Sequence, residues 1–287
     1  MRVAITGARG FVGSALEPAL KRRGHEVRSI SREAIWSAES YAGCEAVVHL
    51  ANVAHTAAGE ALLQRVNVEG TRRAAECAAE RGVKRFVYIS SIKASGEQTA
   101  KWPLDGSETP APQVVYGRAK LAAERALVEV SARSGMAAIV LRPPLVYGPR
   151  VRWKFLSLIR AIARGWPLPL AAIRNRRSLL YVGNLADAIA CCIEAPRPPT
   201  GALPVSDGQA VSTPELCHAL GRALARPARL FPVPTGVLEL LPGMKPLTRS
   251  LEVDDGHLRR ELGWRAPVPF DQALSLTAEW YRLECAT

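Results

Sequence analysis

The 287-residue chain has no apolar run long enough to cross a bilayer, and its N-terminal segment lacks the apolar core and cleavage site of a signal peptide. Aromatic residues make up only 6% of the chain, and no basic stretch is interleaved with them as on many nucleic-acid-binding surfaces. These absences predict a cytoplasmic protein with no membrane span and no nucleic-acid partner.

Cysteine is present, but in no arrangement that carries chemistry. The six cysteines form no C-x-x-C pair, and no cluster of cysteine and histidine has the spacing of a metal site. The sequence therefore implies neither disulfides nor a metal ion. We expect small, mostly buried side chains at Cys44, Cys77, Cys191, Cys192, Cys217 and Cys285.

Acidic residues are scarce relative to basic ones: 26 Asp and Glu oppose 38 Lys and Arg, which gives a formal net charge of +12. The basic residues occur in short scattered groups, such as residues 21–23 and 174–177. A positive surface also attracts small anionic molecules. We therefore favour a phosphate-bearing ligand over nucleic acid as the partner.

The first two thirds of the chain alternate between short apolar runs and segments with helical spacing of apolar residues. Such alternation predicts a parallel sheet covered on both faces, an α/β fold of the doubly wound Rossmann type. Pro18 lies inside the first helical segment, which predicts a bent or late-starting helix there. Strands are expected at 2–6, 25–30, 46–51, 84–90 and 137–143, and helices at 10–24, at 71–82 and after Tyr116.

The pattern loosens beyond residue 143, where prolines become more frequent. We expect the nucleotide-binding core to comprise residues 1–145, with 178–205 returning to its sheet as a strand and a helix. Residues 146–177 and 206–287 would form a smaller, discontinuous C-terminal lobe that binds the substrate, and its closing portion is expected to be helical.

A glycine series follows the first predicted strand directly and leads into a helix. Gly7, Gly10 and Gly13 form a G-x-x-G-x-x-G turn, the context in which a dinucleotide pyrophosphate approaches the backbone and a helix N-terminus. The sequence thus predicts a dinucleotide site. Its candidate contacts in this turn are Gly7, Arg9, Gly10, Phe11 and Val12.

The end of the second strand usually distinguishes NAD from NADP, because an acidic residue there binds the 2′-hydroxyl and a basic one accommodates a 2′-phosphate. This chain has Ser31 and Arg32 at that place, and Arg9 in the glycine turn could add a second positive charge. Glu33, one position later, points the other way. We favour NADP(H), with NAD(H) as the alternative.

Tyr116 and Lys120 are four residues apart in a predicted helix, so they share one face. A phenol has a pKa near 10, and a neighbouring ammonium together with a positively charged nicotinamide would lower it toward neutrality. Ser90 and Ser91 end the strand before this helix, and a serine hydroxyl could hold the reacting oxygen. The combination predicts proton transfer in alcohol and ketone chemistry beside a hydride carrier.

These motifs together resemble the extended short-chain dehydrogenase/reductase family over nearly the whole chain. The resemblance rests on "TGARGFVG", "VVHLA", "NVEGT", "VYISS", "YGRAK", "LRPPLVYGP" and "RRSLLYVGNLADAI". Within the family the chain is similar to bacterial nucleotide-sugar 4-reductases and 4-epimerases that act on UDP-activated N-acetylhexosamine derivatives. The resemblance implies a Rossmann core with a C-terminal substrate lobe, and a homodimer formed through two helices of each subunit.

The resemblance also implies roles for single residues. Tyr116 would be the general acid/base, Lys120 its partner and a ligand of the nicotinamide ribose, and Ser91 the catalytic hydroxyl, with Ser90 the less favoured neighbour. Further cofactor contacts implied by the family are Leu50, Ala51, Asn67 and Pro143. The substrate contacts would be Ser91, Lys93, Pro144 and Arg177, of which the arginine would clamp the diphosphate unless it forms an ordinary surface salt bridge.

The chain departs from the family pattern in three places. Sugar-nucleotide dehydratases carry Asp-Glu after the catalytic hydroxyl residue, where this chain has Ile92 and Lys93, so dehydration is disfavoured. Lys93 is either a solvated side chain or a substrate contact. Residues 31–45 are too few for the usual excursion, which predicts that an edge strand is missing, and Lys154 stands where relatives commonly carry Asn.

The sequence thus predicts an NAD(P)-dependent enzyme that reduces the C4 ketone of a UDP-4-keto-6-deoxy-N-acetylhexosamine. A UDP-N-acetylhexosamine or UDP-hexose 4-epimerase would use the same residues and is the first alternative. An NADP(H)-sensing binding protein is the second, although such proteins tend to lose the tyrosine or lysine that this chain retains.

Overall fold

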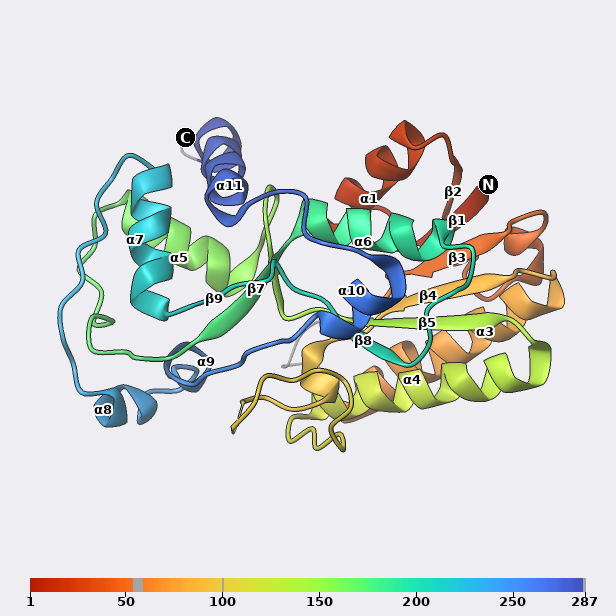
Figure 1. The fold of residues 1–287 in the computed structure, drawn as a ribbon, viewed down its shortest axis with the longest axis horizontal. Coiled ribbons are helices and arrows are strands. Elements are labelled where there is room, and N and C mark those ends of the chain that lie inside the picture. Colours follow the sequence, from red (N-terminus) through yellow and green to blue (C-terminus); the bar gives the residue numbers. More distant parts are fainter. Residues whose placement is uncertain (54–58, 100, 286–287) are drawn as a thin grey trace.

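The structure, a computed structural model, describes residues 1–53, 59–99 and 101–285. Its larger part is a six-stranded parallel sheet in the order β2-β1-β3-β4-β5-β8 (Figure 1). This is the strand order of a doubly wound Rossmann-type sheet that lacks one edge strand, and the doubly wound fold was predicted. The strands are β1 (Arg2–Thr6), β2 (Glu26–Ile30), β3 (Ala46–His49), β4 (Arg85–Ile89), β5 (Ala137–Arg142) and β8 (Ala202–Pro204).

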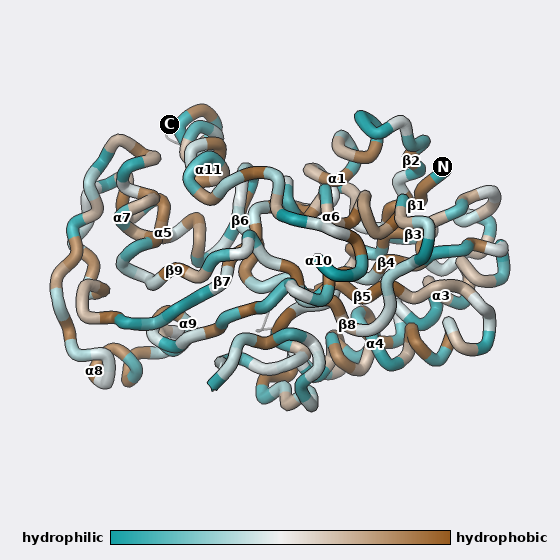
Figure 2. Tube along the Cα trace, viewed as in Figure 1, coloured by the Kyte–Doolittle hydropathy of each residue, from teal (hydrophilic) through white to brown (hydrophobic). Residues whose placement is uncertain are grey.

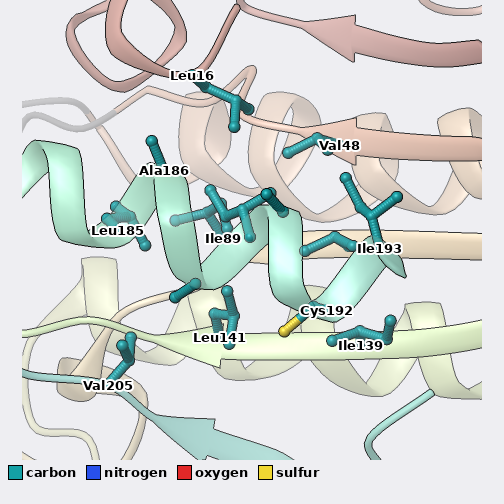
Figure 3. Packing of buried hydrophobic residues seen from close by; sticks show 14 of the residues in the cluster. Leu16, Val48, Ile89, Ile139, Leu141, Leu185, Ala186, Cys192, Ile193 and Val205 are labelled. Atoms are coloured by element: carbon teal, nitrogen blue, oxygen red, sulfur yellow. The ribbon is translucent and has the colours of Figure 1, made fainter. Parts of the chain in front are cut away.

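Helices cover both faces of this sheet (Figure 1). Alternate residues along each strand point to opposite faces. Val3, Ile5 and Val48 accordingly lie in the cluster that α1 and α6 close, whereas Ala4 and Val47 lie in the cluster under α3 and α4. Figure 3 shows α6 laid across the strands with its apolar side chains inward. These helices are α1 (Phe11–Arg22), α3 (Gly70–Glu80), α4 (Val115–Ser134) and α6 (Val182–Glu194).

A second, three-stranded sheet and a group of helices form the smaller part of the molecule, beside the carboxyl edge of the main sheet (Figure 1). Their apolar side chains make a separate core around Tyr147, Phe155 and Leu220. The three strands are β6 (Leu145–Tyr147), β7 (Arg177–Tyr181) and β9 (Ala210–Val211). The helices are α5 (Trp153–Ala163), α7 (Thr213–Ala223), α8 (Thr235–Glu239), α9 (Lys245–Thr248) and α11 (Phe270–Glu284).

The remaining elements are short. They are α2 (Glu60–Leu63), the π-helical turn η2 (Gln64–Glu69), α10 (Gly256–Leu262), and the 3-10 turns η1 (Ala38–Tyr41) and η3 (Ile92–Ala94). Residues 31–45 contain η1 and no strand, so the predicted loss of an edge strand is confirmed. No helix in the described ranges is long and apolar enough to span a membrane.

Three expectations need correction. The first helix runs from Phe11 to Arg22 through Pro18, so it does not start late. The strand expected to return to the main sheet, β7, pairs instead with β6 and β9, and the chain returns through α6 and β8. In the closing portion only α11 packs in the smaller core, because Leu258 of α10 belongs to the core of the main sheet.

Candidate active site

The backbone of the glycine turn after β1 lies so close to neighbouring chain segments that two of its positions have no room for a side chain. Gly7 has a positive φ of 73°, and a β-carbon there would lie 2.9 Å from the backbone nitrogen of Ala51. A β-carbon on Gly13 would overlap the carbonyl oxygen of Ala8. The N-terminus of α1, capped by Gly10, has no side-chain hydrogen bond and no acidic residue in its first turn. The turn therefore fits a dinucleotide pyrophosphate, which would satisfy these free N–H groups.

The segment after β3 is held against this turn. The backbone N–H of Leu50 donates to the Thr6 carbonyl at 3.1 Å, and that of Ala51 to the Thr6 hydroxyl at 3.3 Å. Asn67 is fully buried, and its amide makes a pair of hydrogen bonds, of 2.8 and 3.0 Å, with the backbone of Val53. Asn67 thus fixes the loop that would line the cofactor.

The end of β2 has mixed charge. Ser31, Arg32 and Glu33 are all exposed in the turn that follows Ile30. A backbone N–H and the Ser31 hydroxyl lower the pKa of Glu33, and the positive charges of Arg32 and Arg9 lower it further. Arg9 and Arg32, which favour NADP(H), therefore lie close to Glu33, the acidic residue that favours NAD(H).

Tyr116 and Lys120 occupy one face at the start of α4. The Lys120 ammonium is fully buried, donates to the Ile89 carbonyl at 2.8 Å, and lies 5.9 Å from the centre of the Tyr116 ring. Burial lowers the pKa of Lys120 to about 7, against the opposing effect of Glu124. Burial also raises the pKa of Tyr116 to about 12. The lowering predicted for the phenol is thus absent in the chain by itself and would have to come from a bound cofactor.

The loop that carries Ser91 is pressed against the start of this helix. A β-carbon on Gly117 would overlap the carbonyl oxygen of Lys93, so glycine is required for the close approach. The Glu97 carboxylate accepts hydrogen bonds of 3.0 to 3.1 Å from the backbone N–H groups of residues 113 and 114, just before α4. These contacts bring the Ser91 loop beside Tyr116.

Ser90 and Ser91 have different partners, which supports the preference for Ser91. The Ser90 hydroxyl is buried and donates to the Glu124 carboxylate. The Ser91 hydroxyl caps η3, where it accepts the backbone N–H of Lys93 at 3.2 Å. Only Ser91 therefore retains its hydroxyl proton for a reacting oxygen.

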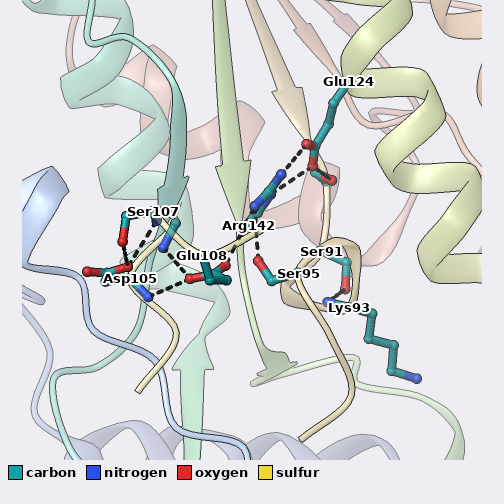
Figure 4. A network of polar contacts seen from close by, with 10 residues as sticks. Ser91, Lys93, Ser95, Asp105, Ser107, Glu108, Glu124 and Arg142 are labelled. Carbon is teal, nitrogen blue, oxygen red and sulfur yellow. Dashed lines mark hydrogen bonds and ion pairs between the residues drawn. The ribbon is translucent and has the colours of Figure 1, made fainter. Parts of the chain in front are cut away.

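A buried polar network lies behind these residues and was not predicted from the sequence (Figure 4). Arg142, at the end of β5, binds both carboxylate oxygens of Glu124 on α4, at 3.0 and 2.6 Å. It also donates to the Ser95 hydroxyl at 2.9 Å and lies 3.9 Å from the carboxylate of Glu108. Because Glu124 in turn accepts from Ser90, one guanidinium joins β5, α4 and the Ser91 loop. The detectable signal was the spacing Lys120-x-x-x-Glu124, which continues the face of Tyr116.

Arg177 begins β7 and is half-buried. Its guanidinium donates to the carbonyl of Arg249 at 2.8 Å, and no carboxylate within the described part of the chain forms an ion pair with it. Burial lowers the pKa of Arg177 to about 10. A buried cation without a carboxylate partner is stabilised by an external anion, so the surface salt bridge considered from sequence is absent.

Lys93 lies close to this guanidinium. Burial lowers the pKa of Lys93, the negative charge of Glu97 opposes this, and the positive charges of Arg177 and Lys154 lower it further. In the described residues its ammonium has no hydrogen-bond or ion-pair partner, and Figure 4 shows it extending away from the Arg142 network. Lys93 is therefore half-buried near two cations and one carboxylate, and its burial disfavours the solvated-loop interpretation.

Pro143 and Pro144 are buried between β5 and β6. The Pro143 carbonyl accepts the backbone N–H of Ile92 at 2.9 Å, which ties this turn to the Ser91 loop. The candidate residues thus gather where β1, β3, β4 and β5 end, at the carboxyl edge of the sheet, where ligands of open α/β sheets bind. The described residues contain no group of three or more side chains suited to hold a metal ion.

The sequence matches the NAD dependent epimerase/dehydratase family over residues 3–202. The chain belongs to this family. A UDP-glucose 4-epimerase of Vibrio cholerae is 34% identical to it over 96% of this chain and 94% of the relative. An Escherichia coli O157:H7 protein, N-acetyl-alpha-D-glucosaminyl-diphospho-ditrans,octacis-undecaprenol 4-epimerase, is 31% identical over 65% of this chain and 61% of its own length.

Two solved structures share the fold over almost the entire chain. UDP-N-acetylglucosamine 4-epimerase from Bacillus cereus has a TM-score of 0.86 and 21% identity, and covers 98% of this chain and 99% of its own. MoeE5 in complex with UDP-glucuronic acid and NAD has a TM-score of 0.83 and 25% identity, and covers 99% of both chains. The resemblance to extended short-chain dehydrogenase/reductases of nucleotide sugars is confirmed, and a nicotinamide cofactor is supported.

Replacing Lys120 should show how much stability the burial of its ammonium costs the folded chain. The pKa of Lys120 is about 7 in the folded chain and about 10.4 in an unfolded one. Between these values only the unfolded chain holds the proton, so the stability cost of Lys120 shrinks as pH rises from about 7 to about 10.4. We expect Lys120→Met to be more stable than the wild type near pH 6.5, with a free energy of unfolding higher by about 1 kcal/mol or more and a higher unfolding temperature. Near pH 9.5 the gain in free energy of unfolding should be smaller.

Thermal unfolding of the ligand-free protein at the two pH values measures this difference. Lys84→Met is the matched control, because Lys84 is exposed and its removal should leave the pH dependence unchanged. An equal change in unfolding temperature for both substitutions at both pH values would contradict the conclusion that burial of the Lys120 ammonium destabilises the folded chain.

Proposed function

We propose that this chain is a 4-epimerase of a UDP-activated hexose or N-acetylhexosamine, which oxidises and then reduces C4 with a bound nicotinamide. The observation that carries the proposal is the face of α4 on which Tyr116 and the Lys120 ammonium lie together, pressed against the Ser91 loop. The family membership and the 4-epimerase names of two curated relatives support it. They support epimerisation over the net ketone reduction that the sequence alone favoured.

In this proposal the three residues divide the proton chemistry. When bound, the nicotinamide supplies hydride acceptance and hydride return at C4. Tyr116 takes the proton from the C4 hydroxyl and later gives it back, while the Ser91 hydroxyl holds that oxygen. The Lys120 ammonium stabilises the phenolate of Tyr116 and binds the ribose of the cofactor. The glycine turn, Leu50, Ala51 and Pro143 form the rest of the cofactor site.

The substrate side rests on unpaired positive charge. Arg177 would bind the diphosphate through its guanidinium fork, with Pro144 lining the site and Lys93 contributing a second cation. Because Lys93 is not a carboxylic acid, it cannot supply the acid and base needed to remove water. The proposed reaction therefore keeps all the oxygens of the sugar.

Purified protein is tested with UDP-glucose and UDP-N-acetylglucosamine, each in turn, with and without added NAD⁺. Inversion at C4 without net consumption of cofactor is the expected result. Conversion of a UDP-4-keto-6-deoxy-N-acetylhexosamine with stoichiometric loss of NADPH, and no inversion of the UDP-hexoses, would replace the epimerase by the reductase. Cofactor binding without either reaction would leave a sensor of nicotinamide nucleotide.

The reductase is kept as a second candidate because of one observation. Arg9 and Arg32 both act on the carboxylate of Glu33 at the end of β2, where a 2′-phosphate of NADP(H) would lie. Net reduction requires a cofactor that exchanges in each turnover, and NADPH is the usual donor. A preference for NADPH over NADH in binding, lost in Arg32→Glu, would favour this candidate.

Arg177→Gln should weaken substrate binding without disturbing the cofactor. A charge-assisted hydrogen bond contributes about 1.5–3 kcal/mol, so we expect KM for the nucleotide sugar to rise about 10- to 100-fold. Arg176→Gln is the matched control, because that neighbour is exposed and paired with Glu252 at 2.8 Å. Steady-state kinetics measures both variants. Equal KM values in the two would remove Arg177 from the diphosphate site.

A further inference from the structure

The positive charge of the chain is concentrated in two segments. Residues 146–177 and 216–250 contain thirteen Lys and Arg residues and a single acidic residue, Glu239, a net charge of +12. This equals the formal net charge of the whole chain, so the rest of the molecule is balanced. Both segments lie in the smaller part of the molecule, around α5, α7, α8 and α9 (Figure 1).

The one acidic side chain in these segments is already engaged. The Glu239 carboxylate accepts a hydrogen bond of 2.8 Å from the Thr248 hydroxyl and forms an ion pair of 3.3 Å with Arg249. The hydrogen bond from Arg249 lowers the pKa of Glu239. Two of the other cations, Arg176 and Arg222, form ion pairs with Glu252 and Asp271 outside the segments. The two segments contain no further carboxylate for the remaining cations.

Large apolar side chains are exposed on the same surface. In residues 231–245, Leu240 is 83% exposed, Leu241 54%, Val237 53% and Phe231 43%. Single exposed hydrophobic residues are common, but a group of four on one short segment marks an interaction site. Figure 2 shows the hydrophobic colour at α8 and on the chain leading to it, at the outer edge of the molecule.

The local structure explains why these side chains remain outside. Leu238 is only 2% exposed and anchors α8 in the smaller core. Its neighbour Val237, and Leu240 and Leu241 directly after the helix, are directed outward. Trp166, 55% exposed, lies next to this surface. Two residues further on, the Leu168 N–H donates to the Arg229 carbonyl at 2.8 Å, and the Leu168 carbonyl accepts the N–H of Phe231 at 3.0 Å.

Cations surround the exposed apolar group. The Lys154 ammonium donates to the carbonyl of Gly243, within the same segment, at 3.1 Å. Arg164 stacks over Trp166 at 5.4 Å from the ring centre. Lys245 and Arg229 are exposed on the segment itself and directly before it. Apolar tips flanked by cations are the combination that binds anionic lipid surfaces.

We propose that residues 231–245, which we term the apolar loop, dock the smaller part of the molecule on an anionic phospholipid bilayer. Leu240, Leu241 and Val237 enter the interface, and the surrounding Lys and Arg side chains bind the headgroups. A second copy of the chain would bring the same positive surface against this one. Nucleic acid gains little from exposed leucine and valine, because its bases bind aromatic side chains.

The apolar loop also lies next to the candidate substrate site. The Arg177 guanidinium donates a hydrogen bond to the carbonyl of Arg249, which directly follows α9. Docking would therefore bring the proposed diphosphate site close to the bilayer surface. The inference is independent of the proposed reaction, since it uses none of the catalytic residues.

Sedimentation with lipid vesicles tests the proposal. The full chain should bind vesicles of phosphatidylglycerol and phosphatidylcholine, bind phosphatidylcholine alone weakly, and be released by high salt. Leu240→Ser combined with Leu241→Ser should reduce the vesicle affinity by about tenfold or more, because each leucine loses about 1.5 kcal/mol or more of apolar burial. Leu283→Ser, which alters a 75% exposed leucine on α11, is the matched control and should bind as the wild type does.

Circular dichroism confirms folding of each variant. Absence of wild-type binding to anionic vesicles, or equal loss in the loop variant and the Leu283→Ser control, overturns the proposal. A change from dimer to monomer in the loop variant with unchanged vesicle binding assigns the surface to a second copy. Binding to DNA that competes fully with vesicles, and that the loop variant retains, assigns the cations to nucleic acid instead.

Discussion

A Tyr116→Phe variant should lose turnover by about 10²- to 10⁴-fold while binding nicotinamide cofactor as the wild type does. The substitution removes only the hydroxyl that would exchange a proton with the C4 oxygen. The ring stays packed against Leu63, Val68 and Ala119, and the Lys120 ammonium stays buried beside it. The loss should therefore lie in kcat, with little change in KM.

Steady-state kinetics on the UDP-sugar that the wild type inverts, together with cofactor titration by fluorescence, measures both quantities. Tyr41→Phe is the matched control, since Tyr41 is fully buried and its hydroxyl donates to the Ile35 carbonyl at 2.7 Å, outside the site. It should cost some stability and leave kcat within a few-fold. Full activity of Tyr116→Phe would remove the tyrosine from catalysis.

Arg142→Met should lower the free energy of unfolding by about 3–5 kcal/mol. Both Arg142 and Glu124 are almost completely buried, at 3% and 6% exposure, and the methionine would leave the carboxylate without its cation. The loss should also disturb the Ser91 loop, because the same guanidinium binds Ser95. We expect a lower kcat in the fraction of protein that remains folded.

The double variant Arg142→Met with Glu124→Leu distinguishes the unpaired charge from lost packing. Removing both ions should recover much of the stability that either single substitution loses. Urea unfolding measures all four proteins. Arg176→Met is the exposed control, with an expected change of about 0–1 kcal/mol, because its ion pair with Glu252 is on the surface. Additive losses in the double variant would contradict a coupled pair.

Much of the fold could be predicted because it depends on local patterns. The first strand was predicted with its observed bounds, and the alternation of apolar runs with helical segments correctly indicated the doubly wound sheet. The glycine turn was also predicted, because glycine is favoured where the backbone takes a positive φ or packs closely against another chain segment. Family resemblance then supplied the reaction class.

The errors arose where pairing partners are distant. The strand β7 carries a run of buried apolar residues like those of the main sheet, yet it pairs with β6 and β9. Such a run records burial on both faces and does not specify its neighbours. Pro18 was expected to bend or delay the first helix. The helix is not delayed and continues through Pro18, because α1 is held by packing against α6.

The residues of the proposed site divide in the same way. Tyr116 and Lys120 could be paired from sequence because four residues make one helical turn, which fixes their shared face. The partners of Arg142 and of Arg177 could not, because each contact joins residues brought together only when separate strands, helices and loops pack.

The sequence by itself determined the first five strands, the glycine turn, the tyrosine and lysine on one helix face, and the total charge. Only the tertiary structure decided that Ser91 rather than Ser90 keeps a free hydroxyl, and that burial moves the pKa of Lys120 down and that of Tyr116 up. It also decided that the cations lie on one part of the molecule beside exposed leucines. Burial and long-range charge depend on which segments meet in space, and short-range spacing along a chain does not encode that.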